Sequence, residues 1–335
     1  MAGLALAIFL SFVPAFLCAA VVYWIDHFEK EPHILLGAVF GWGAVVATLG
    51  AMVSQLVLSG AVHLWTGSED TADLAGATLF APLTEESLKG AAVLLVFLVL
   101  RREFDSLLDG IVYAGIVALG FAATENVLYL YGAFLEGGME DLLSIAFLRV
   151  GLGAWDHPFY TAFIGIGLAA ARLSRSAAVR WLAPPAGWGM AVFTHSLHNS
   201  LATASEHMPA LGLLMFLIDW SGWLAISLLI FWSLHQEGRL LALHLADEVD
   251  RCLTPQQYRT ASSLGTQIGA RFRALGSGRL GSTRRFYRLC GELAHKKHQL
   301  ALLGDEGGNS LAIEGLRAEL ARLSGQADCD RSSGA

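Results

Sequence analysis

The sequence predicts an all-α, polytopic membrane protein with about seven transmembrane helices and a small helical C-terminal tail. The chain has 335 residues, of which 55% are hydrophobic and only 15% are charged. Soluble domains carry about a quarter charged residues, so a soluble globular protein is excluded. Of the 22 Lys and Arg residues, 14 follow residue 235. This asymmetry predicts a membrane domain over 1–235 and a water-facing, arginine-rich helical tail over 236–335.

Seven apolar segments are long enough to cross a bilayer as helices, which takes roughly 20 residues. The first lacks the positively charged start of a cleavable signal peptide, so we expect it to be retained. Pro82 and Pro158 fall inside the third and fifth segments, where proline is expected to kink or break a helix. The predicted spans are 4–24, 34–57, 73–100, 108–133, 142–171, 184–204 and 210–234.

The loops between these spans predict the orientation, because short loops rich in Lys and Arg stay in the cytoplasm. The loops at 101–107 and 172–183 carry arginines, beginning with Arg101 and Arg102 in the first of them. The loops at 58–72, 134–141 and 205–209 carry neither Lys nor Arg. We therefore expect the N-terminus outside and the tail in the cytoplasm.

The tail contains apolar residues at three- and four-residue intervals, as in LLALHLADEVDR, which predicts helices. Its last ten residues are expected to be disordered. The four cysteines match no metal-ligand or disulfide spacing, and we expect them to be reduced.

The stretch PLTEESLKG places two carboxylates and a lysine inside the third span. A charge at the centre of a bilayer costs roughly 2.5–3.5 kcal/mol, so such residues usually face a cavity or a partner. We expect a helix to restart behind Pro82 with Thr84 as its N-cap. Glu85 and Lys89, four residues apart, are expected to pair, which leaves Glu86 pointing elsewhere. A Glu–Lys pair that only fixes helix packing is the alternative, and it explains only one of the two glutamates.

Three further spans contribute polar groups at similar depth. A single one of them could be a packed, hydrogen-bonding residue, but two histidines and an asparagine within five residues favour a site. Together with the glutamates they predict a polar chamber that opens toward the extracytoplasmic side. The residues are Glu125 and Asn126 in the fourth span, Asp156 and His157 in the fifth, and His195, His198 and Asn199 in the sixth.

A carboxylate flanked by imidazoles suits hydrolysis. Glutamate can act as a general base on water, and histidine or asparagine can stabilise an oxyanion. Two histidines and a glutamate are also an acceptable zinc ligand set with water in the open position. The membrane part lacks the His-Glu-x-x-His and Gly-x-Ser-x-Gly motifs, which argues against zincin and serine chemistry.

These ordered motifs resemble the PrsW family of intramembrane proteases, over roughly residues 20 to 235. The family is distantly similar to the CAAX prenyl endopeptidase and bacteriocin-immunity (ABI) superfamily. The matching stretches are DHFEKEP, PLTEESLKG, DGIVYAG with GFAATEN, the intramembrane His157, and HSLHN.

The resemblance implies hydrolysis of membrane-anchored proteins in a bacterial cytoplasmic membrane, near its extracytoplasmic side. The activity described for the family is site-1 cleavage of an anti-sigma factor. The resemblance also implies Glu85 or Glu86 as general base, with His157, His195 and Asn199 binding the oxyanion or orienting other groups.

The supporting residues would be Lys89, Glu125, Asn126, Asp156 and His198. Glu125 stands where the wider superfamily has a histidine, so its role there does not carry over directly. If zinc is used, its ligands would be Glu86, His157 and His195. We favour metal-independent glutamate chemistry with no cofactor, and keep zinc as the alternative.

Two other functions fit part of the pattern. Broken helices with carboxylates at mid-membrane are typical of ion- or proton-coupled transporters, but the sequence contains no repeated half. A non-catalytic membrane sensor or scaffold could use the basic tail to recruit cytosolic partners. Nothing indicates a nucleic-acid partner.

Overall fold

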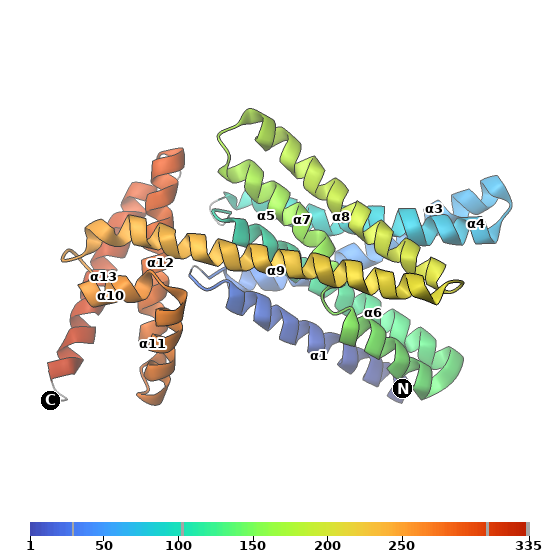
Figure 1. The fold of residues 1–335 in the computed structure, drawn as a ribbon, viewed down its shortest axis with the longest axis horizontal. Coiled ribbons are helices and arrows are strands. Elements are labelled where there is room, and N and C mark those ends of the chain that lie inside the picture. Colours follow the sequence, from blue (N-terminus) through green and yellow to red (C-terminus); the bar gives the residue numbers. More distant parts are fainter. Residues whose placement is uncertain (29, 102–103, 306–307, 333–335) are drawn as a thin grey trace. The chain divides into compact units, whose positions relative to one another are not determined.

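The computed structural model confirms the all-α prediction (Figure 1). It describes residues 1–28, 30–101, 104–305 and 308–332. Glu29 of the DHFEKEP stretch and Arg102 of the predicted cytoplasmic loop therefore lie outside the described residues. The chain divides into two compact units, which are unit 1 (Met1–Ile25 and Glu31–Leu228) and unit 2 (Asp26–Lys30 and Leu229–Ala335).

Unit 1 consists of α-helices interrupted by short π-helical segments. Its core helices α1, α6, α7 and α8 pack in that order against one another, and α5 packs against α6, α7 and α8 (Figure 1). The elements are α1 (Ala2–Ile25), α2 (His33–Gly41), η1 (Trp42–Ala47), α3 (Thr48–Thr66), α4 (Glu69–Ala75), η2 (Gly76–Phe80), α5 (Ala81–Val99), α6 (Leu107–Ala146), η4 (Phe147–Leu152), α7 (Asp156–Leu173), α8 (Ala177–Ser205) and the first part of α9 (Pro209–Leu245).

Four helical stretches within the described residues are long and apolar enough to cross a membrane. They contain five of the seven predicted spans, and Leu107–Leu173 is long enough for two of these. The other two predicted spans correspond to α5 with the segment before it and to α8. The four stretches are Ala2–Ile25, His33–Thr66, Leu107–Leu173 and Pro209–Glu248.

The chain passes Pro82 without a break, so the predicted helix restart is wrong. The π-helical segment η2 leads directly into α5, and Pro82 lies in the first turn of α5, where proline is well tolerated because of its missing N–H. Thr84 Oγ1 donates to the main-chain oxygens of Phe80 (2.7 Å) and Ala81 (3.2 Å). Thr84 is thus bonded back to the preceding turn, not a helix cap.

The loop expected at 134–141 is mostly helical. Helix α6 runs through it and changes direction at Gly138, which has φ 78° and ψ −148°, a conformation that favours glycine. Further along, η4 ends near Gly153 and α7 begins at Asp156. Pro158 consequently lies in the first turn of α7 and does not kink a continuous helix.

Helix α7 approaches both of its neighbours closely because it carries glycines on two faces. A Cβ atom at Gly165 would lie 2.0 Å from the main-chain oxygen of Gly110 in α6. A Cβ atom at Gly167 would lie 2.5 Å from the main-chain oxygen of Ala183 in α8. Small residues at helix interfaces allow such approach within membranes. The crossings hold α7 between α6 and α8.

Unit 2 is helical, as the periodicity of the tail predicts. Helix α13 continues to Ser332, so part of the stretch expected to be disordered is helical, and residues 333–335 lie outside the described residues. The assignment of unit 2 to the cytoplasm stays a prediction. Its elements are the end of α9, η5 (Ala246–Glu248), α10 (Pro255–Ala261), α11 (Leu264–Gly276), α12 (Leu280–Leu303) and α13 (Asn309–Ser332).

Candidate active site

The two adjacent glutamates of α5 have different surroundings. Glu86 is 0% exposed, and its two carboxylate oxygens accept hydrogen bonds from Lys89 Nζ (2.6 Å), His195 Nδ1 (2.9 Å) and Thr161 Oγ1 (2.8 Å). Glu85 is also buried, but its Oε2 has no hydrogen-bond partner among the described residues. This oxygen lies 3.7 Å from Lys89 Nζ and 3.9 Å from His195 Nε2.

Lys89 is fully buried among the site residues and pairs with both glutamates, so the predicted ion pair with Glu85 is present but is the longer of the two. Its Nζ is closer to Glu86 than to Glu85, because residues three apart on a helix face one another as well as residues four apart do. It also lies 3.1 Å from His157 Nδ1 and 4.4 Å from the centre of the Phe121 ring. Lys89 is therefore the closer partner of Glu86, and Glu85 keeps a carboxylate oxygen without a hydrogen bond.

His157, at the start of α7, is oriented by α6 and by the arginine of η4. Its Nε2 lies 2.9 Å from Glu125 Oε2, and because a carboxylate only accepts, Nε2 carries the proton. Its Nδ1 then offers a lone pair toward Lys89. Arg149 pairs with Glu125 and donates from Nε to Asn126 Oδ1 at 2.8 Å. Arg149 therefore holds Glu125 in place, and Glu125 in turn orients the His157 ring.

His195, on α8, has the equivalent arrangement with the nitrogens exchanged. Its Nδ1 donates to Glu86, so Nε2 offers a lone pair on the side of Glu85. His195 as a whole residue is 3% exposed. One face of its ring stacks on Tyr160 with a centroid distance of 4.8 Å, and the edge of the His157 ring approaches at 5.2 Å.

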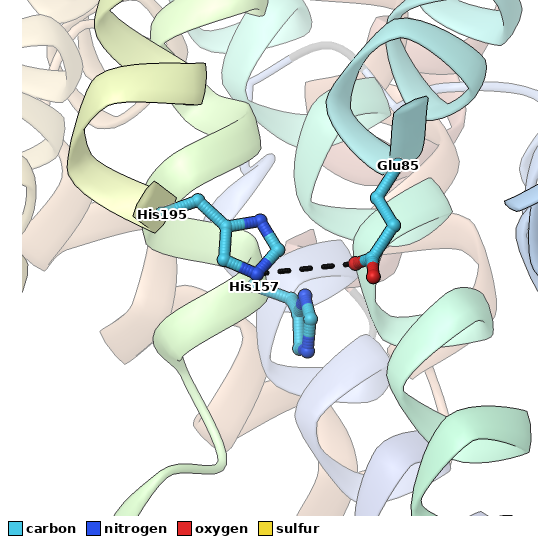
Figure 2. Close-up of side chains that lie close together, drawn as sticks. All are labelled: Glu85, His157 and His195. Carbon is cyan, nitrogen blue, oxygen red and sulfur yellow. Dashed lines mark ion pairs between the residues drawn. The ribbon is translucent and has the colours of Figure 1, made fainter. Parts of the chain in front are cut away.

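Glu85, His157 and His195 converge from α5, α7 and α8 (Figure 2). One ligand atom from each lies within 4.8 Å of the other two. Each imidazole gives one nitrogen to a carboxylate, as metal-binding histidines usually do. Nε2 of His195 keeps its lone pair, whereas Nδ1 of His157 accepts from Lys89 Nζ, a contact that a bound metal ion would displace. The Glu85 oxygen without a partner completes a His₂Glu donor set of the kind that zinc accepts. The residues fit a metal ion.

The remaining predicted site residues lie apart from this centre. Asn199 donates from Nδ2 to the main-chain oxygen of Ala77 (2.8 Å), which ties α8 to η2. Asp156 and His198 belong to a neighbouring group with Asp219. The zinc ligand set predicted from the sequence contained Glu86, whereas the group that could hold a metal contains Glu85.

The sequence interpretation missed Thr161 and Tyr160. Thr161 is 0% exposed and follows His157 by four residues on α7, so helical spacing could have indicated it. Tyr160 is 1% exposed, and no spacing signal separates it from an ordinary core aromatic residue. Both lie in the WDHPFYT stretch that carries His157.

Comparison with known proteins gives a consistent result. Residues 31–228 match a family described as PrsW family intramembrane metalloprotease. The protease PrsW of Geobacillus kaustophilus (strain HTA426) is 30% identical over 202 residues, which cover 59% of this chain and 81% of that protein. The protease PrsW of Bacillus subtilis (strain 168) is 34% identical over 171 residues, covering 50% and 71%. No solved structure matches the chain.

These findings correct the prediction about cofactors. We favoured metal-independent glutamate chemistry, but the matching family is described as a metalloprotease and the chain brings two imidazoles and an open carboxylate together. The sequence interpretation kept zinc only as the alternative, with Glu86 instead of Glu85 in its ligand set. The family is also one of peptidases, which leaves no support for the transporter or the scaffold.

Proposed function

The chain belongs to the PrsW family of intramembrane metalloproteases, and we propose that Glu85, His157 and His195 form its active site. As a peptidase it acts on protein substrates. The observation that carries the assignment of the site is the contrast between the two glutamates. Glu86 accepts three hydrogen bonds, while Glu85 presents an oxygen without a hydrogen bond beside the two imidazoles.

Glu85, His157 and His195 would hold the zinc ion. A zinc ion in such a site polarises a carbonyl oxygen and lowers the pKa of its bound water to about 7. The chain's other residues prepare the ligands. Glu86 fixes the tautomer of His195, and Glu125 fixes that of His157. Mutation of such supporting partners typically lowers metal affinity or activity by about 10- to 100-fold.

Lys89 places a positive charge inside the site, 3.1 Å from His157 Nδ1. A preorganised cation beside the scissile bond stabilises the negative charge that develops on the carbonyl oxygen. Because Lys89 is 0% exposed, water screens this charge little. We assign oxyanion stabilisation to Lys89, which brings three N–H donors and a positive charge to the group of Glu85, His157 and His195, instead of to Asn199, whose amide donates to Ala77 in η2.

Metal analysis tests the assignment of ligands. The purified full-length chain is expected to contain zinc and to lose cleavage of a single-pass membrane substrate after chelation, with activity restored by added Zn²⁺. Glu85→Gln and His195→Ala should both lower bound zinc, whereas Glu69→Gln, an exposed residue of α4, should not. If Glu85→Gln retains full zinc but loses activity, Glu85 is the general base and not a ligand.

The charges of the loops support a specific membrane topology. We propose seven spans, with the N-terminus outside and unit 2 in the cytoplasm of a bacterium. The substrate would be a membrane-anchored protein cut near the extracytoplasmic side, such as an anti-sigma factor. Reporter fusions at 58–72 and 101–107 should report opposite sides of the membrane. Full-length single-pass proteins should accumulate in cells that carry only the Glu85→Gln variant.

A further inference from the structure

A second polar group lies beside the proposed active site. It contains Asp156 at the start of α7, His198 on α8 and Asp219 on α9, and one ligand atom from each lies within 4.8 Å of the others. Asp219 falls inside the long apolar stretch of α9. A carboxylate at that position is costly unless it has a specific partner.

Asp219 joins three helices through its two oxygens. It is 3% exposed. His198 Nδ1 donates to its Oδ2 at 2.7 Å, and the hydroxyl of Tyr160 donates to its Oδ1 at 3.4 Å. Asp219 therefore connects α9 to α8 and to α7.

Tyr160 transmits this contact to the active site. Its ring lies nearly parallel to the His195 ring, with centroids 4.8 Å apart and planes inclined by 18°. Glu86 holds His195 at its Nδ1 edge, whereas Tyr160 covers its face. The contact with Asp219 Oδ1 restrains the hydroxyl of Tyr160. The direction of the His195 Nε2 lone pair thus depends on both contacts.

We propose that Asp219 is a positioning residue of the hydrolytic reaction, which acts through Tyr160 to fix the plane of the His195 ring. This inference rests on the proposed function, because it takes His195 as part of the active site. His198 holds the second oxygen of Asp219 and so sets the direction of the first.

Docking of α9 does not by itself require this carboxylate. A Cβ atom at Gly222 would lie 2.2 Å from the ring of Phe159, so α9 already approaches α7 closely there. The rings of Trp223 and Trp155 are in contact at 5.8 Å. These contacts hold α9 by apolar packing, and an apolar residue at 219 would serve such packing at lower cost.

The test compares Asp219→Asn, Tyr160→Phe and the double variant, with Ser221→Ala as a matched control on the exposed side of α9. We expect kcat to fall about 10- to 100-fold in Asp219→Asn while KM stays within about twofold, as for other supporting partners of metal ligands. Zinc affinity, measured by competition with a chelator, should fall in parallel. The double variant should lose no more than the more impaired single variant, because both changes break one path.

Three results would overturn the inference. One is an Asp219→Asn variant with a lowered melting temperature but normal kcat per folded molecule. Another is full additivity of the two single changes. The third is a wild type that binds two metal ions and a variant that binds one, which would make the second group a metal site. Activity retained by His195→Ala would instead contradict the proposed active site, so the two failures are distinguishable.

Discussion

Each unit of the molecule contains a completely buried glutamate whose oxygens accept several hydrogen bonds, but only in unit 1 does a second buried glutamate lie next to it. In unit 2, Glu248 is 0% exposed and accepts from Lys297 Nζ at 2.7 Å and from Arg317 at 2.7 to 3.1 Å. Both cations retain some contact with solvent. In unit 1, Glu86 is equally closed by its partners, yet one oxygen of the neighbouring Glu85 has no hydrogen-bond partner among the described residues.

The comparison distinguishes a buried carboxylate with a structural role from one that is available to bind a ligand or to react. A buried carboxylate whose oxygens are all partnered is compensated within its unit, and removal of a partner leaves an uncompensated charge. A buried carboxylate with an open oxygen costs stability and is retained where a ligand or substrate uses it.

The largest contrast is in activity. Glu85→Gln should lower kcat/KM for a single-pass substrate by about 100- to 10,000-fold, because it removes a metal ligand or a proton acceptor from the reacting centre. Glu248→Gln should leave kcat/KM per folded molecule within about twofold. The measurement is cleavage in detergent at 25 °C. Equal losses in the two variants would remove the distinction.

Glu86→Gln should lower both the stability of unit 1 and its activity. It leaves the buried ammonium of Lys89 without its nearest carboxylate, and breaking a buried pair costs about 3–5 kcal/mol. The free energy of unfolding in mixed micelles should fall by that amount, and activity should fall as well. The double change Glu86→Gln with Lys89→Met should recover part of the stability but no activity. A variant as stable as the wild type would contradict the closed character of Glu86.

Glu248→Gln should destabilise unit 2 by less, about 1–3 kcal/mol, because Lys297 and Arg317 can turn toward water when the charge is removed. Hydrogen exchange of α12 and α13 should speed up, while exchange of α6 and α7 stays unchanged. Asp305→Asn, an exposed change in the same unit, is the control.

The smallest effect is a pH dependence of unit 2. Burial, with Arg271 and Lys30 nearby, lowers the pKa of His27 from its usual 6.5 to about 3. The unfolded chain therefore binds a proton below pH 6.5 that the folded unit does not bind. The contribution of His27 to stability is constant above pH 6.5 and falls as the pH is lowered toward 3, by at most about 1.4 kcal/mol per pH unit.

Hydrogen exchange of α11 between pH 7 and 5 measures this slope, after correction for the intrinsic exchange rate. His27→Gln should flatten it, and His207→Gln, an exposed histidine of unit 1, should not. An unchanged slope in His27→Gln would assign the pH dependence to other groups.

The sequence predicts the helical class and the long apolar stretches better than it predicts the contacts between polar side chains. Periodicity and proline positions predict helices, but a π-helical segment such as η2 leaves no pattern of its own. It shifts the helix register before Pro82, and the partner of Lys89 depends on side-chain geometry that spacing alone does not fix. The sequence therefore leaves open which glutamate is the general base, and the zinc ligand set predicted from it contains Glu86, whereas the group that could hold a metal contains Glu85.

Long-range contacts were the other limit. Asp219 and Arg149 are single charges in apolar segments, and their partners lie on other helices. The sequence marks both as costly, but it contains no information on which carboxylate or imidazole each would meet. Asn199 shows the opposite case, since its spacing from His195 predicted a role that its contact with Ala77 takes up.

The pair of Glu125 and Arg149 also bears on how the chain enters the bilayer. The two residues lie on either side of the turn at Gly138 within Leu107–Leu173, which in the proposed topology crosses the membrane twice. Inserted alone, each would cost roughly 2.5–3.5 kcal/mol at mid-membrane. Delivered by the translocon as a hairpin, they neutralise each other at once. We therefore expect a nascent chain truncated before Arg149 to integrate less efficiently than one truncated after Leu173.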